Sequence, residues 1–178
     1  DRVGSLVFGP QHQAEVKPRR SHHAVLQFIH QLQDYSEQLL QPSHDQFALT
    51  DMLEEARRYA LPGTTVFIVS DFHDVTDDCE RQLFELARHS DLNFCHVYDS
   101  METELPAPAV YAVSDGDNQT LLNTADGKLR SQFEQAFIDR SQRLKRFSQQ
   151  LSAGLLSFNS SEPVMTVLAQ AFGKRRKG

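Results

Sequence analysis

The chain has 178 residues, of which 39% are hydrophobic and 24% charged, a composition typical of a globular domain with a hydrophobic core. It excludes intrinsic disorder, collagen and disulfide-rich scaffolds, and no apolar run approaches the roughly 20 residues of a membrane span. Four of the 18 basic residues lie in 174–177, so residues 1–173 carry 14 Lys and Arg against 24 Asp and Glu. This acidic body argues against nucleic-acid binding, and we interpret residues 174–178 as a disordered basic tail.

Two cysteines, Cys79 and Cys95, fall on a predicted helix and a predicted strand, with no spacing typical of a metal site. They indicate small buried side chains in a reducing compartment, so we expect a cytoplasmic protein. The chain begins at Asp1 and enters an apolar run at once, which predicts a fragment of a longer protein. We expect no membrane contact from this segment.

The N-terminal third combines a hairpin with two helices. The apolar run 2–9 predicts a strand, Gly9-Pro10 ends it, and residues 13–16 are a candidate hairpin partner. Helical spacing of apolar residues predicts helices over 22–40 and from Leu49 to Tyr59, the second stopped by Pro62-Gly63.

Strands then alternate with helices, the pattern of a doubly wound α/β domain. Residues 64–70 (TTVFIVS) are β-branched or apolar on both faces, which favours a central parallel strand. The chain order predicts a helix over 77–89, a strand over 92–98, a loop over 99–108, a hairpin of 110–113 with 120–122, a helix over 126–151 and a strand over 154–158. A last helix is expected after Ser161 as N-cap, with Pro163 in its first turn.

Polar side chains gather where the predicted strands end, the edge at which open α/β sheets bind ligands. Asp71, His73 and Asp74 follow the strand 64–70, Asp99 follows 92–98, and Thr50 begins the preceding helix. Oxygen ligands of this kind suit Mg²⁺, with Mn²⁺ or Ca²⁺ as alternatives. These residues are equally explained as helix caps without any ion, and Thr50 as an N-cap.

Catalytic signatures are missing from the sequence. It contains no Gly-rich phosphate loop, no Gly-x-Ser-x-Gly elbow and no His-Glu-x-x-His zinc motif, and structural or surface roles are favoured for the histidines. We therefore expect no catalytic residues and no enzyme activity. One enzymatic alternative is a Mg²⁺-dependent phosphatase of the haloacid dehalogenase type, which needs a second Asp two residues after Asp71. That position is His73 here, and Asp74 lies one residue too far.

A series of short motifs nevertheless resembles one family, the von Willebrand factor A-like "domain of unknown function fifty-eight". The motifs are Asp1-Arg2-Val3-Gly4 before Leu6-Val7-Phe8, then Pro18-Arg19-Arg20, Leu49-Thr50-Asp51, and Val66–Val69 before Ser70-Asp71-Phe72. The resemblance extends from Asp1 to about Phe172. It implies a Rossmann-like, mostly parallel sheet with one antiparallel edge strand over residues 1–173, in a protein-interaction module that works with a MoxR-type AAA+ ATPase on an unidentified client.

The resemblance also implies a metal-ion-dependent adhesion site. In the family pattern an Asp-x-Ser-x-Ser segment, a later Thr and a late Asp hold the ion. Thr50 and Asp71 match the last two, and Ser70, His73, Asp74 and Asp99 are candidates for a supporting second layer. The Asp-x-Ser-x-Ser segment does not occur in the chain, so we expect weak binding, or none, in this chain alone.

Three expectations follow from the resemblance. Thr50 and Asp71 should face one another across the carboxyl edge of the sheet. The family's strand order is 3-2-1-4-5-6, in which residues 3–8 and 13–16 match strands 2 and 3, and residues 64–70, 92–98 and 154–158 match strands 4, 5 and 6. The first, central strand should then precede Asp1, so that the sheet of this chain is incomplete. A structural domain without any ion stays open as an alternative to the adhesion site.

Overall fold

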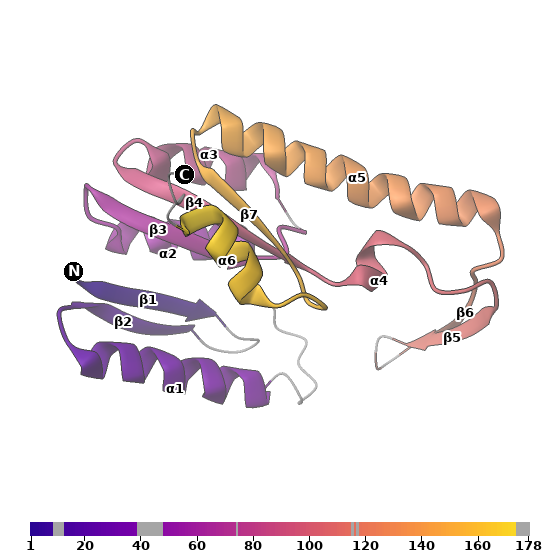
Figure 1. The fold of residues 1–178 in the computed structure, drawn as a ribbon, viewed down its shortest axis with the longest axis horizontal. Helices are drawn as coiled ribbons and strands as arrows, with labels where there is room; N and C mark the ends of the chain where they lie inside the picture. The colour runs from indigo at the N-terminus through magenta and orange to yellow at the C-terminus, as the bar shows by residue number, and fades with distance from the viewer. Residues whose placement is uncertain (9–12, 39–47, 74, 115, 117, 174–178) are drawn as a thin grey trace, which may run out of the picture. The chain divides into compact units, whose positions relative to one another are not determined.

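The computed structural model describes residues 1–178 except 9–12, 39–47, 74, 115, 117 and 174–178 (Figure 1). The chain divides into two compact units, one made of residues 1–61 and 74–86, the other of 62–73 and 87–178. Each unit is described by itself. No described helix is both long and apolar enough to cross a lipid bilayer.

The first unit combines a two-stranded hairpin with three helices. Strands β1 (Val3–Phe8) and β2 (Gln13–Arg19) pair antiparallel, and α1 (His22–Gln38) packs along both of them. Helices α2 (Leu49–Tyr59) and α3 (Asp77–Ala87) complete the unit. Val7, Val16 and Ala24 are buried, as the apolar faces of the hairpin and the helix predict.

The second unit is built on a parallel sheet of three strands in the order β3-β4-β7. These are β3 (Thr64–Ser70), β4 (Ser90–Tyr98) and β7 (Gly154–Asn159). A separate antiparallel hairpin joins β5 (Val110–Ser114) to β6 (Gln119–Asn123). The helices of the unit are α4 (Ser100–Thr103), α5 (Gly127–Gln150) and α6 (Val164–Phe172).

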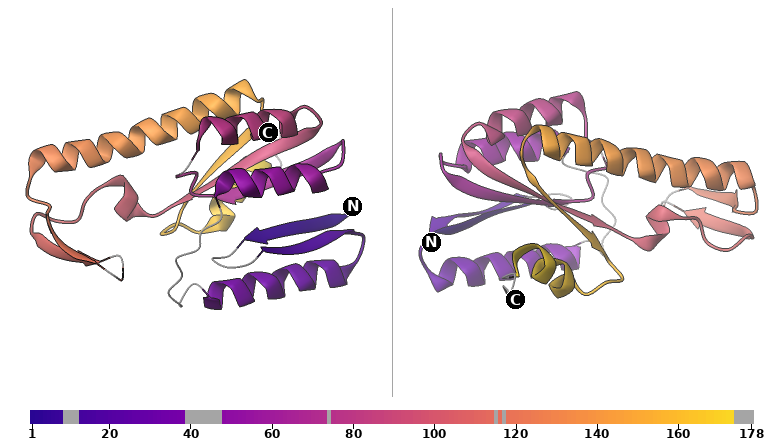
Figure 2. Two further views of the ribbon diagram at one scale, coloured as in Figure 1. Left: turned by 180° about the vertical axis from the view of Figure 1, so that it is seen from behind. Right: turned by 45° about the horizontal axis from the view of Figure 1, so that its top comes forward.

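Helices α5 and α6 lie on opposite faces of this sheet (Figure 2). On one face, Phe94 of β4 stacks on Phe147 of α5 with ring centroids 6.3 Å apart. On the other face, Phe67 of β3 meets Phe172 of α6 edge to face at 6.4 Å. Helices on both faces of a parallel sheet confirm the α/β, Rossmann-like class expected from the sequence.

The structure agrees with the strand order that the resemblance implies and corrects two details. In the described sheet β4 lies between β3 and β7, and Phe67 and Val69 of β3 are 51% and 69% exposed. The apolar composition of 64–70 favoured a central strand, but composition reports how apolar a strand is and not which strands flank it. The expected loop 99–108 contains the short helix α4, and the N-cap of α6 is Pro163, two residues beyond Ser161. The expected tail 174–178 lies outside the described residues.

Candidate functional site

Strand β3 ends in a tight turn that is held by its own polar side chains. The Phe72 backbone N–H donates to Ser70 Oγ at 3.0 Å, and the His73 N–H donates to Asp71 Oδ1 at 3.1 Å. Ser70 Oγ lies 3.4 Å from the same carboxylate oxygen. Short polar side chains favour such turns because they bond to the backbone two residues further on. The result is an exposed Asp71 carboxylate in a fixed position at the carboxyl end of β3.

Phe72 holds this turn against the sheet. Its backbone has φ 51°, a left-handed conformation that is unfavourable for a bulky residue. Its ring is nevertheless buried, 5.4 Å from the ring of Phe94 and 6.3 Å from that of His96. Burial of the ring offsets the backbone strain, so Asp71 and His73 on either side of Phe72 are displayed to solvent.

His96 lies beneath the turn, on the face of β4 that α5 covers. It is 8% exposed, and its ring lies 5.2 Å from that of Tyr98 and 6.3 Å from that of Phe137. Burial lowers the pKa of His96 below its usual value. The charges of Glu102 and Asp71 and a hydrogen bond with the Asp71 backbone oppose this shift, whereas Arg140 adds to it. The neutral imidazole is therefore the form that this packing favours.

We expect the protein to lose stability when acid protonates His96. Because its pKa is lower in the folded state than the unfolded value of about 6.5, the unfolded chain binds the proton more tightly. The free energy of unfolding should be constant above about pH 7 with respect to this group, and should fall as the pH drops through 6.5 towards the folded pKa. Urea unfolding between pH 5 and 8 measures how the free energy of unfolding changes with pH. His96→Gln should reduce this pH dependence, and His22→Gln, at an exposed position, should leave it unchanged. Equal pH dependence in the two variants and the unchanged protein would contradict the expectation.

Asp99, at the end of β4, serves as a helix cap. One carboxylate oxygen accepts the Met101 N–H at 2.9 Å, and Glu102 Oε1 accepts the Asp99 N–H at 2.9 Å, a capping box that begins α4. The other oxygen accepts a hydrogen bond from the Ser160 hydroxyl. This bond, followed by that from Met101, lowers the pKa of Asp99. In the structure Asp99 is therefore a helix cap, which is one of the two interpretations that the sequence allowed.

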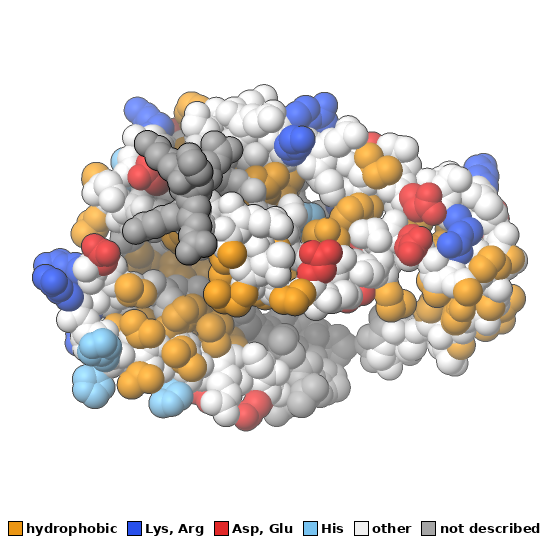
Figure 3. Space-filling view, viewed as in Figure 1, with side chains coloured by type: hydrophobic (Ala, Val, Ile, Leu, Met, Phe, Trp, Pro, Cys, Tyr) orange, Lys and Arg blue, Asp and Glu red, His pale blue; other side chains and the backbone are white. Residues whose placement is uncertain are grey.

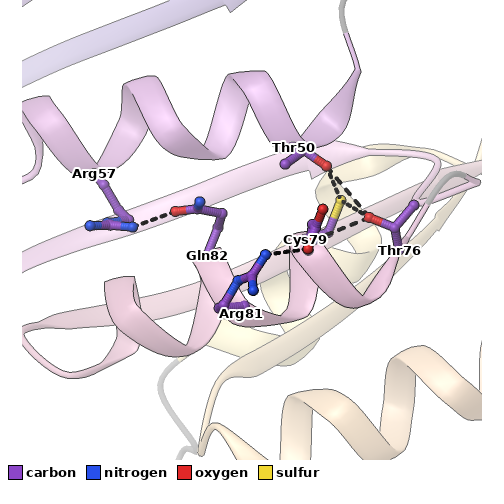
Figure 4. A network of polar contacts seen from close by, with 7 residues as sticks. Thr50, Arg57, Thr76, Cys79, Arg81 and Gln82 are labelled. Carbon is purple, nitrogen blue, oxygen red and sulfur yellow. Dashed lines mark hydrogen bonds and ion pairs between the residues drawn. The ribbon is translucent and has the colours of Figure 1, made fainter.

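Thr50 belongs to a polar network in the first unit (Figure 4). Its Oγ1 lies 3.0 Å from the Cys79 sulfur and 3.5 Å from Thr76 Oγ1, and the Cys79 N–H donates to Thr76 Oγ1 at 3.2 Å. Thr76 therefore caps α3, and Thr50 ties α2 to that capped turn. Thr50 is not an N-cap, because α2 begins at Leu49 with Ala48 in that position. Cys79 and Cys95 are both buried thiols, as their apolar surroundings in the sequence predict.

The structure brings only some of the predicted site residues together. Ser70, Asp71 and His73 share one turn, and Asp99 caps a helix at the end of the neighbouring parallel strand. Thr50 lies in the other unit, so its place opposite Asp71 stays a prediction, and Asp74 falls outside the described residues. Within the described ranges, no group of three or more His, Cys, Asp and Glu side chains is placed to hold a metal ion.

Comparison with known proteins places this fold in a family. The sequence model of the family described as "Protein of unknown function DUF58" matches residues 1–143. The chain belongs to this family. No curated protein matches it. Among solved structures, this DUF58 chain is similar to the crystal structure of the conserved hypothetical protein BatB from Bacteroides thetaiotaomicron, at 12% sequence identity and a TM-score of 0.51. The similarity covers 96% of the DUF58 chain and 76% of the BatB chain, and it supports the α/β, Rossmann-like fold.

Three residues that shape the candidate sites of this DUF58 chain were missed in the sequence. The Thr76 hydroxyl, three residues before Cys79 at the start of a helical pattern, carries a capping signal that could have found it. The left-handed Phe72 has no such signal, because aromatic residues rarely adopt positive φ. Ser160 reaches Asp99 only because β4 and β7 are neighbours in the sheet, which is a tertiary fact.

Proposed function

We propose that this DUF58 chain is a non-enzymatic interaction module that works with a MoxR-type AAA+ ATPase on a client protein in the cytoplasm. The proposed contact is the turn after β3, through a divalent cation held by Asp71. The observation that carries the proposal is an exposed carboxylate held in place at the carboxyl end of a parallel strand, where α/β sheets bind their ligands. The partner and the cation come from the family resemblance.

The chemistry of the turn is compatible with a hard cation. Asp71 uses Oδ1 for the turn, the structure describes no hydrogen bond to its Oδ2, and Ser70 adds a hydroxyl oxygen beside it. Thr50 enters the proposal from the family pattern; a hydroxyl has two acceptor lone pairs, so its contact with Cys79 does not prevent it from binding an ion. Mg²⁺ prefers oxygen ligands of this type. So few ligands leave most coordination positions to water or to a partner.

This arrangement favours binding over reaction. A hard dication with open positions accepts an acidic side chain of the partner as a further ligand. The phosphatase alternative needs an acid two residues after Asp71, but His73 occupies that position and its backbone N–H bonds to the Asp71 carboxylate. No observation on the turn supports that enzyme.

We expect Asp71→Asn and Asp71→Ala to weaken Mg²⁺ binding, and binding to the ATPase, by about tenfold or more, since loss of even a supporting group typically costs a metal site 10–100-fold. The melting temperature should change little, because Asp71 is exposed and its removal leaves the core intact. Titration calorimetry with Mg²⁺ alone and with Mn²⁺, on the longest soluble form of the protein, measures the first effect. Surface-immobilised ATPase with and without EDTA measures the second.

Asp91→Asn is the matched control, because Asp91 is exposed at the opposite, amino end of the neighbouring strand β4. It should leave both affinities unchanged. If Asp71→Ala lowered the melting temperature and left metal binding unchanged, Asp71 would be a structural cap. Mg²⁺-dependent hydrolysis of a generic phosphoester, abolished by Asp71→Asn, would replace the module with the phosphatase.

A further inference from the structure

The hairpin of β5 and β6 is anchored firmly at its base. Thr124, which directly follows β6, is fully buried; its hydroxyl lies 2.8 Å from the Ala107 carbonyl oxygen and accepts the Ala109 N–H at 3.0 Å. The Arg130 guanidinium of α5 donates to the carbonyl oxygens of Pro106 at 2.6 Å and Leu105 at 2.9 Å. These bonds fix the segment that leads into β5, so the hairpin presents a preformed edge.

Beyond this base the hairpin exposes apolar side chains. Val110 and Leu121 are 62% and 73% exposed, and hydrophobic side chains gather at this end of the unit, at the right of Figure 3. The register pairs Ala112 with Leu121 and Val110 with Asn123, so these side chains share one face. Two strands alone make only a marginally stable sheet in water, which favours the addition of further strands to this hairpin.

The outer edge of β6 has no strand partner among the described residues. Neither β5 nor β6 contains a charged residue, whereas exposed edges are ordinarily protected by lysine, proline or inward-pointing charge. Residues 1–173 carry a net charge of −10, so most other surfaces would repel a second copy of the chain. The uncharged hairpin strands are a place where two copies can meet without that repulsion.

The sequence of β6 complements itself. Read antiparallel about Leu121, the segment QTLLN places Leu121 opposite Leu121 of the copy and Gln119 opposite Asn123. We infer that β6 pairs with β6 of a second copy of this chain, across a two-fold axis at Leu121, to form a four-stranded antiparallel sheet. The axis places the two copies of Leu121, the most exposed leucine of the hairpin, beside one another and aligns carboxamides on either side. Such a contact is isologous, as a two-fold interface must be. The inference is independent of the proposed function.

Leu121→Lys tests the inference in the full chain. It places two ammonium groups opposite one another on the axis, and like charges in directly opposed positions destabilise a strand pair. The dissociation constant of the dimer should rise by about tenfold or more, measured by sedimentation velocity over a concentration series. Circular dichroism and thermal unfolding check that the monomer still folds, as an exposed site allows. Persistence of the same dimer in Leu121→Lys, or a monomer at every concentration of the unchanged protein, would overturn the inference.

A disulfide test gives the geometry independently. Directly opposed residues in adjacent strands have Cβ atoms about 4.5–5.5 Å apart, whereas the two copies of Ala112 would be separated by three strand spacings, about 14 Å. Leu121→Cys should therefore form an intermolecular disulfide under mild oxidation, and Ala112→Cys, on the same face of β5, should not. The native Cys79 and Cys95 are buried, so we expect the unchanged protein to form no cross-link under the same oxidation. Equal cross-linking of both variants would mean random collision and would count against the two-fold pairing.

Discussion

Replacing Phe94 with alanine is expected to lower the free energy of unfolding by about 3–5 kcal/mol, the range for buried Phe-to-Ala changes. Phe94 is fully buried at the centre of the described sheet. Its ring lies 5.4 Å from that of Phe72 and 6.3 Å from that of Phe147, so it joins the β3 turn, the sheet and α5. Truncation removes these contacts and leaves a cavity that the rigid strand β4 cannot close.

Urea unfolding monitored by circular dichroism measures this loss. Phe84→Ala is the matched control, because it removes the same group from a side chain that is 57% exposed on α3. We expect that control to cost about 0.5 kcal/mol or less. If both variants lost a similar amount of unfolding free energy, the contacts of Phe94 with Phe72 and Phe147 would contribute little to the stability of the second unit.

Phe72→Ala and Phe72→Gly are expected to reveal the strain in the turn after β3. Either change removes a buried ring and should cost about 3–5 kcal/mol. Glycine in a strand or helix is ordinarily less stable than alanine by about 0.5–1 kcal/mol, but at φ 51° the order should reverse, because only alanine has a Cβ that opposes the left-handed conformation. Phe72→Gly should therefore be the more stable of the two variants.

Both variants lose the same ring contacts. The difference between their stabilities therefore reports the strain of the backbone at position 72 alone. Thermal unfolding of the pair is sufficient to rank them. Ser152 also has a positive φ of 53°, but it is exposed, so Ser152→Ala and Ser152→Gly provide the same backbone comparison without loss of a buried ring. If alanine were the more stable residue at position 72, the left-handed turn would not be a feature of the folded protein.

Most of the helices and strands, and much of their chemistry, could be predicted from the sequence. The alternation of apolar runs with helical spacing predicted β3, β4, β7 and α5 within a few residues, and the turn residues between 110 and 122 predicted the hairpin of β5 and β6. The short motifs around Thr50 and Asp71 indicated the family that the match over residues 1–143 shows. These features are readable because side-chain periodicity, turn chemistry and caps depend on near neighbours in the chain.

The roles of individual side chains depend on contacts that form only in the folded chain. The pairing of β4 with β7 brought Ser160 to Asp99 across 61 positions of sequence. Burial against Phe94 compensates for the left-handed backbone of Phe72, and burial against Phe137 favours a neutral His96. These outcomes depend on packing between residues far apart in the chain. A propensity or a motif spacing describes one segment at a time and contains no information on which segment covers it.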